Sequence, residues 1–278
     1  MDNAALVTAI EQKTAWAKRK VLEMCVHANL GHLTTAYSCA EIVAALYYGV
    51  MRIDPQDPEW DGRDWFIMSK NHGSLMHYPY LADLGFFPAE ELMTFMDDAT
   101  LFGGHSKRAI NGMDFAGGSL GIGLGVGAGI AYAHKMDGKQ NKTFVIVGDG
   151  ETYEGSIWEA AMFAAHNKLD NLITVLDRNH LSCTDFTENM LKSEPIDEKW
   201  HAFGWEVRKC NGHDVGELLN IFADVHERKN EKPLIVIADT VKGHGIDFMS
   251  NQPLFHGNAP PKDRIDEAFA QVTGGADI

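Results

Sequence analysis

Two uninterrupted apolar runs near the middle of the chain predict neighbouring buried strands. Residues 144–147 read Phe-Val-Ile-Val, and residues 172–176 read Leu-Ile-Thr-Val-Leu. Short, β-branched runs of this kind are typical of strands that are covered on both faces. The segment between them repeats its apolar residues with a helical period. A strand, a helix and a strand in this order predict a right-handed crossover between two parallel strands.

Apolar periodicity predicts further elements on both sides of this unit. Helical patterns occur at residues 4–28, 40–50, 74–84, 90–96, 120–134 and 215–226, and short strand-like runs at residues 65–69, 205–210 and 233–240. Ser38, with Glu41 three residues later, has the pattern of a capping box at the start of a helix. Because no repeat or flexible linker divides the chain, we expect one three-layer α/β/α domain over residues 1–278. It should contain a mainly parallel, twisted sheet and a helical N-terminal arm.

A glycine-rich segment, residues 116–133, carries no charge and approaches the length of a membrane span. Its glycine and alanine residues would gain little from transfer into lipid, so we expect it to lie inside the protein. Gly121, Gly125 and Gly129 are spaced by four residues, which predicts close packing of a buried helix. The N-terminus also lacks the basic and then apolar pattern of a signal peptide. We therefore expect no association with a membrane.

The charge and the cysteines restrict the possible partners and the compartment. The formal net charge is −15, and the basic residues are scattered along the chain. Nucleic acid is an unsuitable partner, because its phosphates require a basic face. The four cysteines occur singly, without a C-x-x-C pair, at Cys25, Cys39, Cys183 and Cys210. This pattern predicts reduced thiols and a cytoplasmic location.

Polar residues end both central strands, at the edge of a parallel sheet where ligands bind. Gly148 and Gly150 flank Asp149 after the first strand, and Asn179 follows the second. A carboxylate, an amide oxygen and a backbone carbonyl suit Mg²⁺ or Ca²⁺, with diphosphate oxygens and water completing the shell. A helix expected to begin near Thr152 would direct its N–H groups towards a phosphate at the same place.

This arrangement resembles the fingerprint of enzymes that use thiamine diphosphate. Asn179 follows Asp149 by 30 residues, and Glu154-Gly155 is similar to the transketolase-like branch of that superfamily. The resemblance implies the thiamine diphosphate-binding fold in its diphosphate-binding (PP-type) form. It implies that Asp149, Asn179 and the Leu181 carbonyl bind Mg²⁺, or alternatively Ca²⁺ or Mn²⁺. Glu154 would be either structural or part of a hydrogen-bond path between two sites.

Four histidines lie beside glycines where periodic runs end, as expected of functional loop residues. The resemblance implies that His32, His105 and His256 face the substrate and act in catalysis, and imidazole suits proton transfer at sugar hydroxyls near neutral pH. It also implies a set of residues that bind the cofactor, namely His72, Gly118, Leu120, Gly148, Asp149, Gly150, Glu154, Asn179, Lys242 and His256. Other histidines are expected at the surface or in structural roles, namely His27, His77, His134, His166, His201, His213 and His226.

The resemblance covers nearly the whole chain but only the first part of a full transketolase. It implies the N-terminal subunit of a split enzyme that transfers a two-carbon ketol unit from a ketose to an aldose. The ketose would be phosphorylated or otherwise anionic. Activity would then require a second subunit with the pyrimidine-binding domain, which supplies a glutamate to the cofactor ring. We expect an α₂β₂ heterotetramer in which the glycine-rich helix contacts a second copy.

Two departures from the family pattern leave the sugar specificity open. Leu33-Thr34-Thr35 replaces small residues such as Pro-Gly-Gly, and Ile122 stands where a Gln is common. One alternative function is the α subunit of a thiamine diphosphate-dependent 2-oxo-acid dehydrogenase, or another such C–C bond enzyme, although the histidine motifs speak against it. A nucleotide-binding oxidoreductase is a second alternative. Its glycine pattern here, from Gly123 to Ala128, lacks the preceding strand that such a motif requires.

Overall fold

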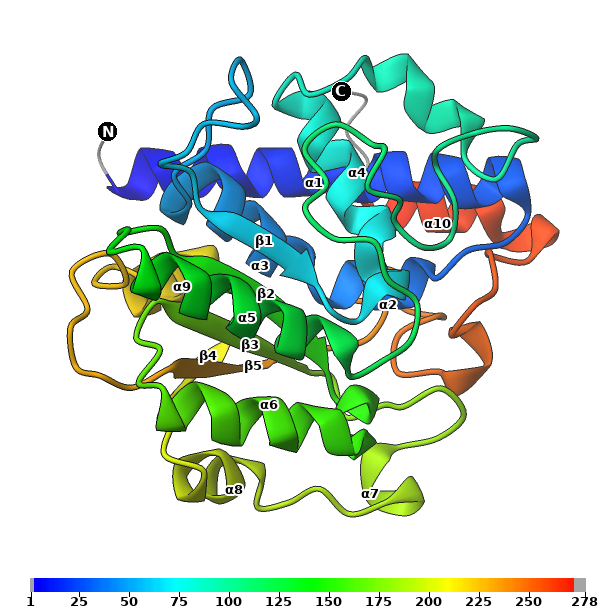
Figure 1. Ribbon diagram of the computed structural model, residues 1–278. Coiled ribbons are helices and arrows are strands. Elements are labelled where there is room, and N and C mark those ends of the chain that lie inside the picture. Colours follow the sequence, from blue (N-terminus) through cyan, green and yellow to red (C-terminus); the bar gives the residue numbers. More distant parts are fainter. Residues whose placement is uncertain (1–2, 273–278) are drawn as a thin grey trace.

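The computed structural model describes residues 3–272 and contains one five-stranded sheet (Figure 1). All neighbouring strands are parallel, in the order β1-β2-β3-β5-β4. The strands are β1 (Trp65–Met68), β2 (Thr143–Gly148), β3 (Leu172–Arg178), β4 (Glu206–Asn211) and β5 (Leu234–Asp239). The expected parallel sheet is confirmed, and β2 and β3 are neighbours as the central strand–helix–strand unit predicts.

Helices cover both faces of the sheet and produce the predicted three layers (Figure 1). One face is covered by α5 (Ile122–Met136), α6 (Gly155–His166) and α8 (Ile196–Ala202). Helices on the other side are α1 (Asn3–Ala28), α3 (Ala40–Ala45), α4 (Ser74–Asp83), α9 (Val215–Ile221) and α10 (Ile265–Val272). The helix α1 is the predicted N-terminal arm.

The central strands are apolar throughout because alternate side chains enter two separate cores. Phe144 and Ile146 of β2 pack with the helices of the α1 side, whereas Val145 and Val147 pack with α5 and α6. Every residue of β2 and β3 is buried. The strand ends that carry the polar residues are therefore held by packing on both faces of the sheet.

The start of the helix after Ser38 differs from the prediction. The chain forms a short helix, α2 (Leu33–Ser38), and α3 begins after Cys39 without a side-chain cap. The Ser38 hydroxyl donates instead to the Asp177 carboxylate, at 2.5 Å, and to the Thr35 carbonyl. A buried carboxylate requires hydrogen-bond donors, and this requirement overrides the local capping pattern. The predicted helix 40–50 also changes into a π-turn at Leu46–Val50.

Three other predicted helices have different bounds. The segment predicted as helix 90–96 is a 3₁₀ turn, Ala89–Thr94, and α9 ends at Ile221 rather than near residue 226. After Asp149 the chain forms a 3₁₀ turn, Gly150–Tyr153, and α6 begins only at Gly155. The N-terminus of α6 therefore does not start beside Asp149, as the sequence suggested.

The glycine-rich helix α5 packs through other glycines than those predicted. A Cβ atom on Gly127 would lie 2.5 Å from Val145 Cγ2, and one on Gly123 would meet Ser69 at a similar distance. Gly125 and Gly129 face open space, so the predicted role of their spacing in close packing is wrong. Among residues 3–272, no helix is both long enough and apolar enough to cross a membrane.

Candidate active site

A cavity of about 390 Å³ opens at the carboxyl edge of the sheet, where β1, β2, β3 and β5 end. It is also bordered by the loop between α1 and α2. The structure brings nearly all the predicted site residues together around this cavity, namely His32, His72, His105, Gly118, Leu120, Gly148, Asp149, Gly150, Asn179, Leu181, Lys242 and His256. Glu154 is the exception. None of the seven histidines expected to be structural or on the surface lines it.

The four histidines form one cluster although they are distant in sequence. The His32 ring lies 5.2 Å from His72, 6.1 Å from His105 and 5.2 Å from His256, measured between ring centroids. His72 and His256 are 5.3 Å apart. Each residue comes from a different loop at the same edge of the sheet. Their ring nitrogens can therefore contact several groups of one small ligand.

Burial keeps these imidazoles uncharged. It lowers the pKa of His32 to about 4, and the nearby His105 and Lys242 act in the same direction. Burial and the charge of Lys242 lower the pKa of His256 to about 3. Burial and Lys70 also lower the pKa of His72. Near pH 7 these three rings are neutral, so each has one nitrogen that accepts and one that donates a hydrogen bond.

Two buried lysines give the cavity its positive charge. Lys70 forms an ion pair with Asp177 and donates to the Thr35 carbonyl at 3.0 Å. Burial alone would lower the pKa of Lys70, but Asp177 outweighs it and the pKa is raised. Lys242 donates to the Ser182 carbonyl and contacts His256 Nδ1, both at 2.8 Å. Burial, reinforced by Lys70, lowers the pKa of Lys242 to about 8.

Thr35 is a cavity residue that the sequence interpretation did not assign. Its hydroxyl is buried and has no hydrogen-bond partner among residues 3–272. It belongs to the segment where this chain departs from the family pattern, so the departure places a free hydroxyl in the cavity beside Lys70. Ile122, the other departure, does not line the cavity and lies exposed at the start of α5.

The predicted metal ligands are positioned by an unusual turn after β3. His180, between Asn179 and Leu181, adopts a left-handed conformation with φ 62°. This turn directs the His180 N–H to Asp149 Oδ2, at 2.5 Å, and the Leu181 N–H to Asn179 Oδ1, at 3.1 Å. The Asn179 amide nitrogen donates to Asp177. The amide oxygen therefore faces away from Asp177, on the side of Leu181.

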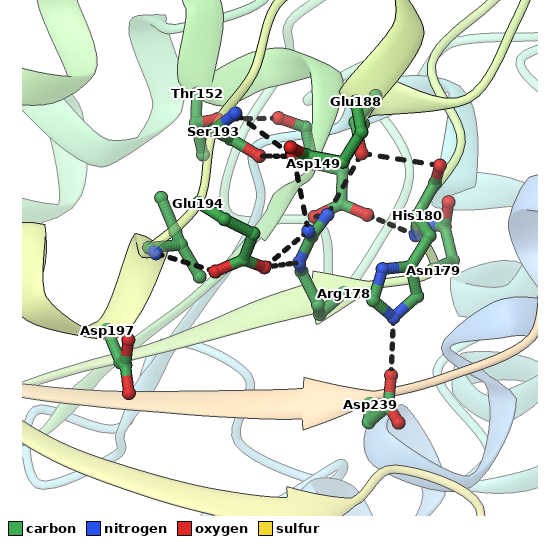
Figure 2. A network of polar contacts seen from close by, with 12 residues as sticks. Asp149, Thr152, Arg178, Asn179, His180, Glu188, Ser193, Glu194, Asp197 and Asp239 are labelled. Carbon is green, nitrogen blue, oxygen red and sulfur yellow. Dashed lines mark hydrogen bonds and ion pairs between the residues drawn. The ribbon is translucent and has the colours of Figure 1, made fainter.

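Arg178 supplies the counter-charge for Asp149 that is missing nearby in the sequence (Figure 2). Its guanidinium lies 3.1 Å from Asp149 Oδ1 and 2.6 Å from Glu194 Oε1, and it also donates to Thr187. Burial nevertheless raises the pKa of Asp149 to about 7, against the influence of Arg178. The same arginine thus attaches the segment that contains α7 (Thr187–Met190) to the end of β2.

Glu151, rather than Glu154, is the buried glutamate of the site. It accepts hydrogen bonds from Ser69 Oγ at 2.5 Å, from the Gly121 N–H at 2.9 Å and from the Gly148 N–H at 3.0 Å. Burial raises its pKa. Glu151 therefore joins the ends of β1 and β2 to the loop that carries Gly118 and Leu120. Its only sequence signal is its place directly after Gly150.

Glu154 lies outside the cavity, on the exposed face formed by α5 and α6. It is the residue before α6 but makes no capping hydrogen bond there. Its Cβ atom packs closely against Gly121, where an added Cβ would lie 2.6 Å away. The left-handed φ of Gly121, 84°, and this contact both require glycine. A role of Glu154 towards the cofactor stays a prediction.

The donor set of the cavity fits a diphosphate and a divalent cation. Lys70, Lys242 and the unpartnered Thr35 hydroxyl can all donate to phosphate oxygens. Asp149, Asn179 and the Leu181 carbonyl offer the hard oxygen atoms that Mg²⁺ prefers. Gly148 and Gly150 lie close to Lys70 and Ser182, and a Cβ at either would stand 3.2–3.3 Å from these neighbours. The close backbone approach expected for these glycines is confirmed.

The family model for "Transketolase, thiamine diphosphate binding domain" matches residues 10–274. This chain belongs to the transketolase family. A relative from Actinobacillus succinogenes, one of the two subunits of an apulose-4-phosphate transketolase, is 38% identical over 95% of each chain. The 6-deoxy-6-sulfo-D-fructose transketolase subunit SqwG of a Clostridium species is also 38% identical, over 92% of this chain and 93% of its own.

Solved transketolases have the same fold. The enzyme from Leishmania mexicana superposes with a TM-score of 0.86 at 28% identity, covering 95% of this chain and 41% of that one. The Campylobacter jejuni transketolase gives the same TM-score and identity, covering 96% and 43%. This transketolase-family chain thus spans less than half of these enzymes but nearly the full length of the relatives that are named as transketolase subunits. It carries the thiamine diphosphate-binding domain.

Proposed function

We propose that this chain is the diphosphate-binding subunit of a two-chain transketolase. It would transfer a two-carbon ketol unit from a ketose donor to an aldose acceptor, in complex with a second subunit. The observation that carries the proposal is the cluster of neutral histidines directly beside Lys70 and Lys242, at strand ends that also present Asp149 and Asn179. One cavity therefore combines an anion site, a cation site and groups that exchange protons with hydroxyls.

Each part of the cavity has a defined role in this proposal. Lys70, Lys242, Thr35 and His72 hold the diphosphate, while Asp149, Asn179 and the Leu181 carbonyl bind Mg²⁺. Gly118 and Leu120 pack against the rings of the cofactor. Bound thiamine diphosphate supplies the carbon nucleophile and the electron sink that cleavage of a C–C bond requires.

The histidines would position the substrate and move its protons. His32, His105 and His256 hydrogen-bond the sugar hydroxyls at the cavity mouth. Because the pKa values of His32 and His256 lie well below 7, their free nitrogens are available as acceptors at neutral pH. Such a ring can take a proton from a hydroxyl as the neighbouring C–C bond breaks and return it to the product.

The exposed face of α5 and α6 supports a partner. It carries a group of large apolar side chains at the surface, namely Ile122, Val126, Tyr132, Met136, Met162 and Phe163. An apolar surface of this kind is typical of a protein interface. The relatives whose names mark them as subunits extend over almost the same length as this chain. We infer a second subunit with the pyrimidine-binding domain, in an α₂β₂ assembly where Glu154 lies at the interface.

The donor is proposed to be an anionic ketose. The names of the relatives refer to a sugar phosphate and to a sulfonated sugar, so a terminal anion is their shared feature. The cytoplasm is the proposed location, and it is consistent with free thiols at all four cysteines, of which three are buried.

Reconstitution with the partner tests the proposal. The purified chain should bind thiamine diphosphate with Mg²⁺ in a calorimetric titration but transfer no ketol unit alone. Addition of the partner subunit should give transfer from a ketose phosphate or ketose sulfonate to an aldose. The Asp149→Asn variant should lose cofactor binding and activity together, whereas the exposed Lys262→Met variant should retain both.

Two results would refute this function. Ketol transfer by the chain without any partner would remove the need for a second subunit. Oxidation of pyruvate with a lipoyl acceptor, in place of ketol transfer, would assign the pair to the 2-oxo-acid dehydrogenases. Quenching of tryptophan fluorescence by NADH, but not by thiamine diphosphate with Mg²⁺, would instead support a nucleotide-binding oxidoreductase.

A further inference from the structure

A second charged cavity lies at the opposite, amino-terminal edge of the sheet. It has a volume of about 230 Å³ and is formed by the loops that lead into β2, β3 and β5. Figure 1 shows the C-terminal end of α5 and the loop before β5 at this end of the sheet, away from α2 and α7. The six residues of β2 separate the cavity from Asp149, a distance of about 20 Å at the usual rise of a strand.

The lining of this cavity is basic, in contrast to the chain as a whole. Its charged residues are Lys135, Lys139, Lys142, Arg228 and Lys229, together with one carboxylate, Asp170. Lys139 is paired with Asp61, and Arg228 is paired with Glu206. No carboxylate among residues 3–272 pairs with the other three lysines. Local positive charge therefore remains in a protein whose formal net charge is −15.

Lys142 is the central observation. Its side chain is buried, with the residue only 5% exposed, yet its ammonium makes no hydrogen bond or ion pair with residues 3–272. Its backbone is satisfied, because its N–H donates to Asp64 and its carbonyl accepts from the Trp65 N–H. A buried ammonium without a partner is costly, since burial removes its hydration without replacement. Burial accordingly lowers the pKa of Lys142.

Two neighbours in the same lining also have an unsatisfied polar atom. The Nε of Arg228 is buried and has no acceptor, although the other guanidinium nitrogens bind Glu206 and the Lys232 carbonyl. The Oδ1 of Asn171 is buried and has no donor, although its amide nitrogen donates to the Ala131 carbonyl at 2.8 Å. A ligand that satisfies all three groups must accept from two cations and donate to one amide oxygen.

We propose that this cavity binds a phosphate-type oxyanion, either inorganic phosphate or a small phosphomonoester. Its oxygens would accept from Lys142 and Arg228, and a hydroxyl of hydrogen phosphate or of the ester would donate to Asn171. Lys135 and Lys229 would attract the anion from the rim. Asp170, whose carboxylate accepts from the Glu231 N–H, stands at the edge of the site and opposes binding of a larger anion. The site is separate from the cofactor cavity.

Binding is tested by calorimetric titration of the full chain with inorganic phosphate and with glycerol 3-phosphate, at constant ionic strength in chloride. Lys142→Met removes the charge but retains the apolar length of the side chain. It should weaken binding of the preferred anion roughly tenfold or more, as expected for loss of a charge-assisted hydrogen bond. The tighter of the two anions identifies the source of the phosphate group. Thiamine diphosphate affinity should be the same in the wild type and in Lys142→Met.

Lys262→Met is the matched control, because it removes the same charge from an exposed lysine that does not line the cavity. It should leave the affinity unchanged. Lys229→Met, at the rim, gives a second and smaller reduction should Lys142→Met not fold. The proposal is overturned if neither anion binds more tightly than chloride. It is equally overturned if Lys142→Met and Lys262→Met bind the anion alike.

Discussion

Lys242 is the charged residue of the cofactor cavity whose protonation changes nearest to neutral pH. Burial and the charge of Lys70 lower its pKa to about 8. Below that pH it carries a positive charge 2.8 Å from His256 Nδ1 and from the Ser182 carbonyl. Above it the charge is lost, so a polyanion in the cavity loses one of its two lysine partners. Anion affinity should therefore depend on pH through this residue.

We predict that the affinity for thiamine diphosphate falls as the pH rises from 7 to 9.5. The bound anion favours the protonated lysine, so the fall should begin near pH 8 and continue until the pKa of the complex is passed. Lys242→Met should weaken binding roughly tenfold at pH 7 and flatten the pH profile. Fluorescence titrations at constant Mg²⁺ measure both effects. Parallel profiles for Lys242→Met and the control Lys262→Met would contradict the assignment.

The four histidines could be predicted because each has a local signal, a glycine that ends a periodic run. Thr35 and Glu151 could not, because what defines them is the arrangement of segments distant in the chain. The unpartnered hydroxyl of Thr35 and the three donors to Glu151 exist only in the folded protein. Glu154 was predicted at the cofactor from its motif, but the chain alone leaves it on an exposed face.

At the scale of secondary structure, the buried strands were predicted to within about one or two residues, whereas several helix ends were not. A strand covered on both faces leaves a continuous apolar run, which is a strong local signal. Helix ends depend on partners elsewhere. Ser38 illustrates this, because its hydroxyl binds Asp177, 139 residues away, instead of capping α3. The single-domain assignment for residues 1–278 stays a prediction.

The glycines of α5 provide a test at this scale. Gly127→Ala should destabilise the chain by about 1–3 kcal/mol, because the new Cβ would lie 2.5 Å from Val145 Cγ2 on a stiff, buried side chain. Gly129→Ala should instead stabilise it by about 0.4–1 kcal/mol, because nothing lies within 4 Å and alanine favours a helix. Urea denaturation of the isolated chain measures both. Equal effects of the two substitutions would contradict the packing described for α5.

For the whole molecule, the decisive quantity is the balance of charge around the cofactor cavity. Lys70, Arg178 and Lys242 are formally balanced by Asp149, Glu151 and Asp177, all of them buried in the same region. The chain as a whole is strongly negative, with a formal net charge of −15. The protein therefore offers a polyanion directed hydrogen bonds but little net attraction.

Metal removal tests this conclusion. With EDTA in excess, the affinity for thiamine diphosphate should fall at least about tenfold, or ~1.4 kcal/mol. Mg²⁺ should restore it, because the cation adds the missing positive charge between Asp149 and the diphosphate. Asn179→Ala should show a smaller response to Mg²⁺ than the wild type. Cofactor affinity that is unchanged by EDTA in calorimetric titrations would contradict this account.

Since Arg178 already occupies one oxygen of Asp149, the apoprotein has little to gain from holding a bare cation. Coenzyme and ion are thus expected to enter as a nearly neutral pair and to leave as one. The concentration of free magnesium would then set the fraction of chains ready for assembly, a form of control that needs no separate regulatory protein.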